Sequence, residues 1–429
     1  MWTSAKTIRA SVETLKRCQR CCMGTVWRGD TDRGQRQLCR VLSSASKPKW
    51  RLLFFGTDHF AVESLKLLTS CRGTSEGIVE TLEVVTLAGD VPVKRFAQEN
   101  HLPLHSWPPD DVNGRFDVGV VVSFGCLLPE RLISKFPYGI LNVHPSLLPR
   151  WRGPAPIFHT ILHGDSVTGV SIIQIRPHRF DVGPILNQQF YQVPENCTAD
   201  ELGGTLATMG AHLLINTLMS LSERMENQRE QGQTGATFAP KIKMSMSWIV
   251  WEEQTCDQID RLYRAVGSRI PLRTMWMGRT IKLLDFDGKC HVSLSDQRRN
   301  PIPGSVSFQK ESNTLAVCCK LGGGVGCLVG VWAFLWAVCV PPQSKGKHLL
   351  CLGADCHSGE DGTWTLGYRD GWVGFRSVLL KKRLTAADFY NGYLHQTQQK
   401  NTPCEMAEGQ FFSKKGGIEV HQMRKNSKL

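Results

Sequence analysis

The stretch ILNVHPSLLP, residues 140–149, decides the fold. Its apolar start, residues 140–143, is typical of a short buried strand. Residues two apart on a strand point to the same face, so Asn142 and His144 can reach one substrate atom. Pro145 cannot donate to the sheet. It opens a loop at the carboxyl end of the strand, where open α/β sheets bind their ligands.

A carboxylate can complete this pair. Asp181 follows in the sequence Phe-Asp-Val-Gly-Pro, 37 residues after His144. An amide such as that of Asn142 can stabilise an oxyanion, and loss of one such donor slows a reaction about 10²–10³-fold. An imidazole can carry a proton between an amine and a leaving group, and a carboxylate can orient it. The three side chains together predict direct acyl transfer between two bound substrates, without a covalent nucleophile or a metal.

Short apolar strands alternate with helical segments around this stretch. We expect strands at residues 52–56, 118–123 and 170–175, and Asp58 can cap the helix that follows the first of them. This order predicts an α/β domain over residues 50–222 with a Rossmann-like, doubly wound parallel sheet.

A polar linker, residues 223–240, leads to a second domain that we expect at residues 241–395. Trp248 and Trp251 are expected to lie on its first strand, with their rings in the core. Several short β segments follow and predict a small, OB-like β-barrel; they are residues 280–284, 304–308, 315–319 and 372–380.

Charge is divided unevenly along the chain, whose net charge is +13. Residues 51–240 have a net charge of −5, whereas residues 241–429 carry +10. A basic second half joined to an acidic first half indicates a polyanionic partner. The run Lys381-Lys382-Arg383 is a candidate for phosphate contacts, and residues 396–429 are expected to be a disordered basic tail.

Residues 1–49 have the pattern of a mitochondrial targeting presequence. Apolar residues recur at helical spacing, basic residues are frequent, and Glu13 is the only acidic residue before Asp30. A basic, amphipathic, acid-poor start is typical of import into the mitochondrial matrix. The 16 cysteines lack the paired spacing of a zinc site, so we expect reduced thiols.

These motifs resemble those of the folate-dependent formyltransferases, and especially of the mitochondrial members that act on methionyl-tRNA. The resemblance rests on Asn142-x-His144-x-Ser-Leu-Leu-Pro, on Arg150-Trp-Arg-Gly and on the later Asp181-x-Gly. It covers about residues 50–320 and 370–395. Each of these residues alone is more often structural, but their combination at this spacing is specific to the family.

The resemblance implies transfer of a formyl group from 10-formyltetrahydrofolate to the α-amino group of initiator Met-tRNA, for translation initiation in the mitochondrial matrix. It also implies a monomer without a stable membrane partner. Asn142 and His144 are expected to stabilise and protonate the tetrahedral intermediate, and Asp181 to orient His144 and the folate. The residues that match the folate-binding segments of the family are Ser123, Phe124, Gly125, Ser146, Leu147, Leu148 and Pro149. Two alternatives stay open: a formyltransferase with a small amine acceptor, and a catalytically impaired splice isoform.

Two features depart from the family pattern. Residues 321–369 form an insertion, because deleting them joins residues 315–320 to 370–374 as a hairpin. Its uncharged, apolar start, residues 321–340, is long enough to span a bilayer. A membrane span there would separate two adjacent strands, so we interpret the insertion as an alternatively spliced or mispredicted segment. If it is present, we expect an exposed apolar patch, aggregation and weakened tRNA binding.

The second departure is a short loop after the strand at residues 83–86. Family members carry a longer, often basic loop here that reaches toward the tRNA acceptor arm. The shorter loop makes the basis of tRNA discrimination an open question but leaves the acyl-transfer residues in place.

Overall fold

The structure is a computed structural model. It describes residues 48–73, 77–110, 112–290, 292, 301–320, 356–358, 364–366, 371–395 and 409–414. The expected presequence up to residue 47, most of the insertion and most of the expected tail lie outside the described residues.

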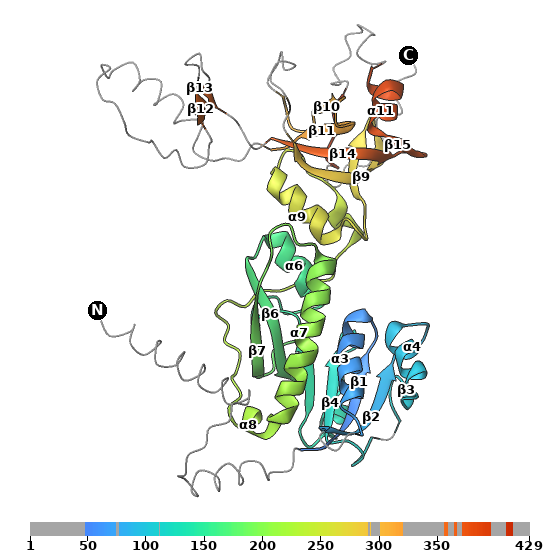
Figure 1. Ribbon diagram of the computed structural model, residues 1–429, viewed down its shortest axis with the longest axis vertical. Coiled ribbons are helices and arrows are strands. Elements are labelled where there is room, and N and C mark those ends of the chain that lie inside the picture. Colours follow the sequence, from blue (N-terminus) through green and yellow to red (C-terminus); the bar gives the residue numbers. More distant parts are fainter. Residues whose placement is uncertain are drawn as a thin grey trace, which may run out of the picture. The chain divides into compact units, whose positions relative to one another are not determined.

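A seven-stranded sheet forms the centre of the N-terminal half, with the order β3-β2-β1-β4-β5-β6-β7 (Figure 1). Its strands are β1 (Trp50–Gly56), β2 (Val79–Thr86), β3 (Leu104–Ser106), β4 (Val118–Val122), β5 (Ile140–His144), β6 (Val167–Gln174) and β7 (Ile185–Gln192). The first five strands run parallel to one another, whereas β6 and β7 are antiparallel to their neighbours. The predicted Rossmann-like α/β domain is confirmed, with a mixed and mostly parallel sheet.

The expected strand at residues 170–175 exists as β6, but it runs antiparallel to β5. His144 at the end of β5 is paired with Ser171 of β6. The short helix α6 (Pro156–His163) between the two strands does not carry the chain back across the sheet. The chain therefore re-enters the sheet at the edge where β5 ended.

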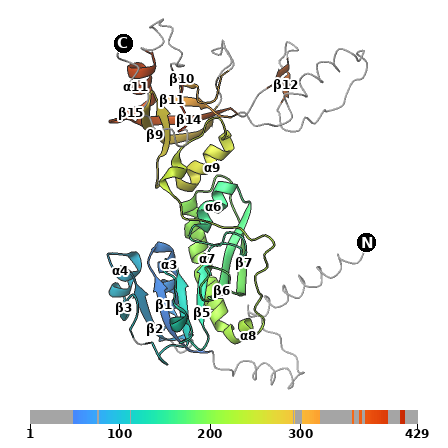
Figure 2. The same ribbon diagram turned by 180° about the vertical axis from the view of Figure 1, so that it is seen from behind.

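Each face of the sheet has its own apolar core, because side chains alternate along the strands. Leu52 and Phe54 of β1 pack in the core that also contains the helices on one face. Leu53 and Phe55 pack in a second core on the other face. Figure 2 shows the ribbon of the same sheet from behind. The remaining helices of this domain are α3 (His59–Ser70), α4 (Pro92–Glu99), α5 (Glu130–Ile133), α7 (Ala199–Met219) and α8 (Leu221–Glu226).

Two side-chain caps start the main helices of this domain. The Asp58 carboxylate accepts a hydrogen bond of 3.1 Å from the Ala61 amide and begins α3, as predicted. Thr198 and Glu201 form a reciprocal capping box at the start of α7. Helix α7 packs against α3 and against β5, β6 and β7, so it covers the antiparallel half of the sheet (Figure 1).

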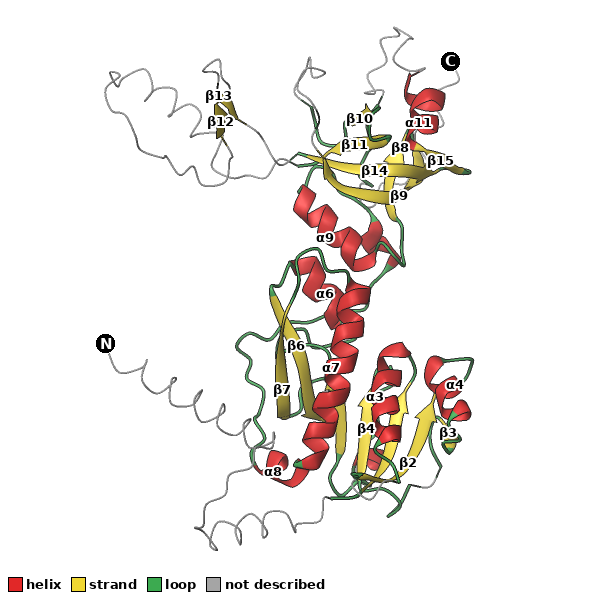
Figure 3. Cartoon of the chain, in the orientation of Figure 1, coloured by secondary structure: helices red, strands yellow, loops and turns green. Residues whose placement is uncertain are grey.

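The second domain is an antiparallel sheet of order β10-β11-β14-β9-β8, with β15 paired to β14 (Figure 3). Its strands are β8 (Leu272–Trp276), β9 (Arg279–Cys290), β10 (Val306–Gln309), β11 (Thr314–Cys318), β14 (Trp372–Leu379) and β15 (Arg383–Thr385). Its helices are η1 (Met244–Ser247), α9 (Cys256–Val266), α11 (Ala386–Phe389) and η3 (Tyr390–Leu394). Trp251 is fully buried, as expected, but its segment forms a turn; the expected first strand is reduced to one bridge between Trp248 and Arg273.

A short piece of the expected tail joins the two edges of this sheet. Gln410 forms an antiparallel bridge with Ser305, which precedes β10, and Phe412 bridges Met275 of β8. Phe411 between them is fully buried. The expectation of a disordered tail over residues 396–429 is therefore wrong for residues 409–414, because an aromatic side chain there fills the core of the barrel.

The two strands that flank the insertion lie side by side. Cys318 of β11 is paired with Trp372 of β14, and the Cys319 amide donates a hydrogen bond of 2.7 Å to the Gly371 carbonyl. The insertion thus leaves and re-enters at one hairpin end, and its described pieces are β12 (Cys356–Ser358) and β13 (Trp364–Leu366), which pair with each other. No helix within the described ranges has the length and apolar character to cross a membrane.

Candidate active site

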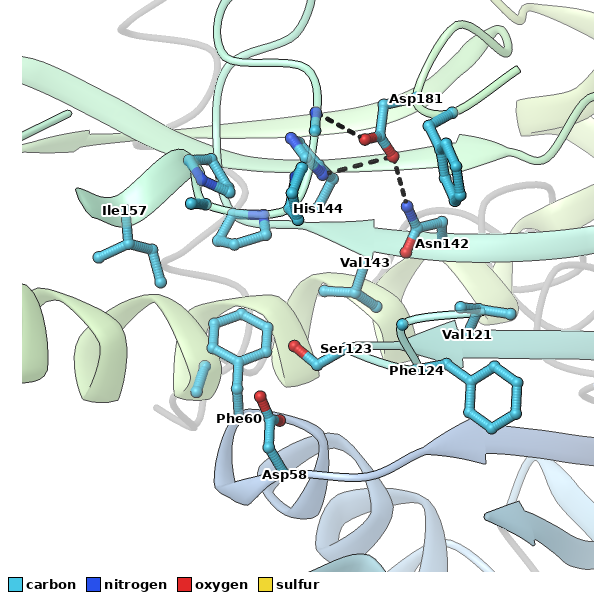
Figure 4. Close-up of a pocket in the computed structure, with 18 of the residues that line it drawn as sticks. Asp58, Phe60, Val121, Ser123, Phe124, Asn142, Val143, His144, Ile157 and Asp181 are labelled. Carbon is cyan, nitrogen blue, oxygen red and sulfur yellow. Dashed lines mark hydrogen bonds and ion pairs between the residues drawn. The ribbon is translucent and has the colours of Figure 1, made fainter. Parts of the chain in front are cut away.

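Asn142, His144 and Asp181 meet at the carboxyl end of β5. Asn142 and His144 point to the same side of the strand, and Asp181 reaches them from the loop between β6 and β7 (Figure 4). Nδ2 of Asn142 donates a hydrogen bond of 3.1 Å to Oδ1 of Asp181. Nδ1 of His144 lies 3.5 Å from the same oxygen. The structure therefore brings together the three residues that the sequence selects.

A backbone amide fixes the second oxygen of this carboxylate. The Gly153 amide donates a hydrogen bond of 2.8 Å to Oδ2 of Asp181. Gly153 has a φ of 116°, and a Cβ at this position would lie 2.9 Å from the carbonyl oxygen of Ala239. Glycine is required here, because any other side chain would be strained and would collide with the linker.

The neighbours of His144 indicate which of its two ring nitrogens carries the hydrogen. Nε2 lies 2.9 Å from the carbonyl oxygen of Trp151, and a carbonyl can only accept, so Nε2 carries a hydrogen. Nδ1 is then the nitrogen that can take up a proton, beside the Asp181 carboxylate. The ring itself is only 5% exposed, so its orientation is set by these neighbours.

The three residues line a cavity of about 1240 Å³. It lies beyond the carboxyl ends of β1, β4 and β5, where the strand order changes direction, which is the usual ligand site of an open α/β sheet. Predicted residues Ser123, Phe124 and Gly125 line it as well. Phe124 is buried against Phe55 and Trp107, so this wall of the cavity is rigid and apolar.

Four of the residues predicted to bind folate, Ser146, Leu147, Leu148 and Pro149, do not line this cavity. They instead build the turn after the catalytic strand. The Ser146 hydroxyl donates to the Arg150 carbonyl at 2.7 Å, and Leu148 packs in a small apolar cluster. Leu148 packs against Ile173 of β6 and Ile185 of β7. The polar ends of Asn142 and His144 face the cavity.

Asp58 is a site residue that the sequence placed only as a helix cap. Its carboxylate lies across the cavity from Asn142, next to Ser123 (Figure 4). Burial raises the pKa of Asp58 above its usual range, and hydrogen bonds from the Ala61 amide and the Ser123 side chain oppose that rise. The signal that could have identified it is its position directly after the Gly-Thr turn that ends β1.

Helix α7 and the second domain also contribute to the cavity. Asp200 and Gly203 of α7 line it, and so does Arg269, which follows α9. Arg269 forms an ion pair of 2.7 Å with Asp200, and the pKa of Asp200 is lowered by hydrogen bonds from Ser268 and Arg269. Sequence analysis missed these residues, because they are distant in the chain from every motif.

The linker runs along the loop that carries Gly153. The Arg152 amide donates to the Thr237 carbonyl at 2.9 Å, and the Ala239 amide donates to the Arg152 carbonyl at 2.7 Å. Nε2 of Gln231 donates to the carbonyl oxygen of Asp181 at 2.9 Å. The linker therefore holds both the loop and the backbone of Asp181 in place.

The fold and the site define the class of formyl-transferring α/β enzymes, and comparisons with known proteins agree. A family model described as "Formyl transferase" matches residues 113–218. The mitochondrial methionyl-tRNA formyltransferase of Homo sapiens is 48% identical over 381 residues, which cover 87% of this chain and 85% of the human protein. The corresponding protein of Mus musculus is 45% identical, with coverage of 85% and 84%. The chain therefore belongs to the mitochondrial methionyl-tRNA formyltransferase family.

Solved structures with a similar chain path include other formyltransferases. A sugar 3N-formyl transferase, crystallised in the presence of dTDP and 5-N-formyl-THF, aligns with a TM-score of 0.45 and 17% identity, over 62% of this chain and 93% of that chain. HypX from Aquifex aeolicus in complex with tetrahydrofolic acid aligns with a TM-score of 0.42 and 15% identity, over 80% of this chain and 47% of that chain.

Proposed function

We propose that the chain transfers the formyl group of 10-formyltetrahydrofolate to the α-amino group of initiator methionyl-tRNA in the mitochondrial matrix, as a monomer. Membership of the family supports the reaction and the compartment. The observation that carries the catalytic assignment is that Asn142 and His144 share one oxygen of Asp181 inside the cavity.

The chemistry follows from the positions of these three side chains. The amine of the aminoacyl group attacks the formyl carbon, and the carbonyl electron pair moves onto oxygen. One N–H of the Asn142 amide is held by Asp181, and the other is available to the oxyanion. The attacking nitrogen loses a proton to Nδ1 of His144, where the Asp181 carboxylate lies beside the charged ring.

Collapse of the intermediate completes the transfer. The carbonyl re-forms, the bond from carbon to N10 of the folate breaks, and N10 takes the proton from His144. The products are the formylated amine and tetrahydrofolate, so atoms and electrons balance without a metal or a covalent enzyme intermediate. The 1240 Å³ cavity is large enough to hold the reacting parts of both substrates.

The test is formylation of Met-tRNA by the full chain and by Asn142→Ala, His144→Ala and Asp181→Ala. We expect each variant to lose about 10²–10⁴-fold in kcat. His212→Ala is a matched control, because this histidine is exposed on α7 and does not line the cavity. Activity of the wild-type chain on glycinamide ribonucleotide, with none on Met-tRNA, would contradict the proposal.

A further inference from the structure

A second cavity adjoins the catalytic one. It has a volume of about 770 Å³ and is lined by Phe180 and Phe238, with Arg179 beside them. Arg179 and Phe180 also line the catalytic cavity, so the two cavities share part of a wall. We propose that this second cavity is a stacking platform for the unpaired 3′ end of the tRNA, with Phe180 and Phe238 as its stacking side chains. The inference rests on the proposed function, since it assigns a site to the acceptor of that reaction.

The two phenylalanines are unusually open to solvent. Phe180 is 60% exposed and Phe238 is 71% exposed. Only one other phenylalanine among the described residues, Phe190, is comparably exposed, and it lines neither cavity. Single exposed apolar side chains are common on protein surfaces, but two aromatic rings facing one cavity indicate a binding surface.

The backbone holds both rings next to the reacting groups. Phe238 forms a parallel bridge with Arg152, one residue before the Gly153 amide that binds Asp181. Phe180 directly precedes Asp181, and Nε2 of Gln231 donates hydrogen bonds to the carbonyl oxygens of Asp181 and Gly183, which follow it. A base stacked on these rings would therefore lie beside the Asp181 carboxylate.

The charge around the rings fits a nucleic acid. The residues that line this cavity include Arg152 and Arg179 and no carboxylate. Arg152 is buried and bonded to Gln231 and Gly232, so exposed Arg179 is the side chain placed to meet a phosphate. Aromatic faces with a nearby cation are the usual means of binding single-stranded nucleic acid without reading its sequence.

The chemistry of the substrate selects this strand end. The methionyl group is esterified to the last nucleotide of an unpaired end, so the terminal bases must lie beside the cavity when the amine reaches Asn142 and His144. A duplex is too wide for a cavity of this volume.

The experiment compares Phe180→Ala and Phe238→Ala with Phe190→Ala in the full chain. We expect each of the first two to raise KM for Met-tRNA about 5- to 100-fold, because that is the contribution of one stacked base. KM for 10-formyltetrahydrofolate and kcat at saturating tRNA are expected to stay unchanged in Phe238→Ala, because Phe238 lines only the second cavity. Phe180→Trp and Phe238→Trp are expected to keep the KM of the wild type. Phe180→Leu and Phe238→Leu are expected to raise it, since a leucine keeps the apolar surface but has no aromatic face.

A direct readout uses tRNA whose 3′-terminal adenine is replaced by 2-aminopurine. Its fluorescence should be quenched on binding to the wild-type chain and to Phe190→Ala, and less so with the Phe180 and Phe238 variants. An active wild-type chain whose Phe180 and Phe238 variants keep normal KM and quenching would overturn the platform while leaving the proposed function intact. A rise in KM for the folate alone would also overturn it, by assigning the cavity to the folate tail.

Discussion

The Asn142 amide donates a hydrogen bond of 3.1 Å to Oδ1 of Asp181, although the two residues are 39 positions apart in the chain. The same oxygen faces His144, and the other oxygen is held by the Gly153 amide. One carboxylate thus contacts both the proposed oxyanion donor and the proposed proton carrier, and the backbone holds its second oxygen. Removing its charge should therefore affect both roles at once.

The substitution Asp181→Asn tests this coupling. An asparagine can still accept from the Gly153 amide, but its NH₂ then faces the NH₂ of Asn142, and no negative charge remains beside a protonated His144. We expect kcat to fall at least about 10²-fold. Thermal unfolding measured by circular dichroism should change little, which separates a local effect from loss of the fold. Activity within a few-fold of wild type would show that Asp181 has no such role.

Gly153→Ala tests the backbone support of the same carboxylate. The new Cβ must adopt a φ of 116° and would lie 2.9 Å from the Ala239 carbonyl oxygen. We expect a loss of roughly 1–3 kcal/mol in the free energy of unfolding and a fall in kcat, because the loop and linker must separate. Gly235→Ala is the matched control: Gly235 also has a positive φ, of 77°, but no atom within 4 Å of its Cβ position. Urea denaturation and kcat should distinguish the two.

Two of the proposed catalytic residues, Asn142 and His144, were predictable as neighbours because short-range rules determine their positions. Alternation along a strand places Asn142 and His144 on one side, and Pro145 ends the strand at the edge where open sheets bind ligands. Asp181 could be selected as a carboxylate able to orient an imidazole, and the family resemblance supported that choice. Neither spacing nor composition, however, says that the loop after β6 folds back. The hydrogen bonds of Asp181 to Asn142 and Gly153 are long-range facts of the fold.

Other parts of the structure could not be read from local pattern. The stretch from Ser146 to Pro149 matches a folate-binding segment of the family, but it does not line the cavity, and Leu148 packs against Ile173 of β6 and Ile185 of β7. Residues 409–414 belong to a stretch that the sequence predicts as a tail. Phe411 is buried because the neighbouring residues Gln410 and Phe412 pair with Ser305 and Met275, at the two edges of the second sheet. The antiparallel direction of β6 likewise depends on the path that the chain takes between β5 and β6, through α6.

Deleting residues 321–369 tests the interpretation of the insertion. The flanking strands are already paired, since the Cys319 amide bonds the Gly371 carbonyl at 2.7 Å, so joining Lys320 to Asp370 leaves a short hairpin connection. We expect the deletion variant to keep its melting temperature and to formylate Met-tRNA at least as fast as the full chain. A deletion variant that no longer folds would show that the inserted residues belong to the barrel.

Phe411→Ala tests closure of the barrel by the segment of residues 409–414. The Phe411 ring is fully buried and lies near the rings of Trp251 and Phe389. Loss of a buried aromatic ring typically costs about 3–5 kcal/mol, so we expect a large fall in the free energy of unfolding measured with urea. Phe190→Ala should leave it nearly unchanged, because that ring is 72% exposed. Equal stability of the two variants would mean that the segment does not close the sheet.

The pH dependence of stability should reveal the ion pair between Arg51 and Asp117, which ties the start of β1 to the loop before β4. The side-chain hydrogen bond from Arg51 lowers the pKa of Asp117. A carboxyl whose pKa is lowered on folding stabilises the protein above its unfolded pKa, about 3.9, and this contribution is lost as the pH falls through the lower folded value.

Asp117→Asn should therefore have a lower melting temperature than wild type at pH 7, and the difference should shrink as the pH is taken below about 4. Asp90→Asn is the control. Asp90 also has its pKa lowered by an arginine, Arg95, but both partners of that pair are largely exposed, so solvent and salt screen it. A difference between Asp117→Asn and wild type that does not shrink as the pH falls below about 4 would arise from packing rather than from charge.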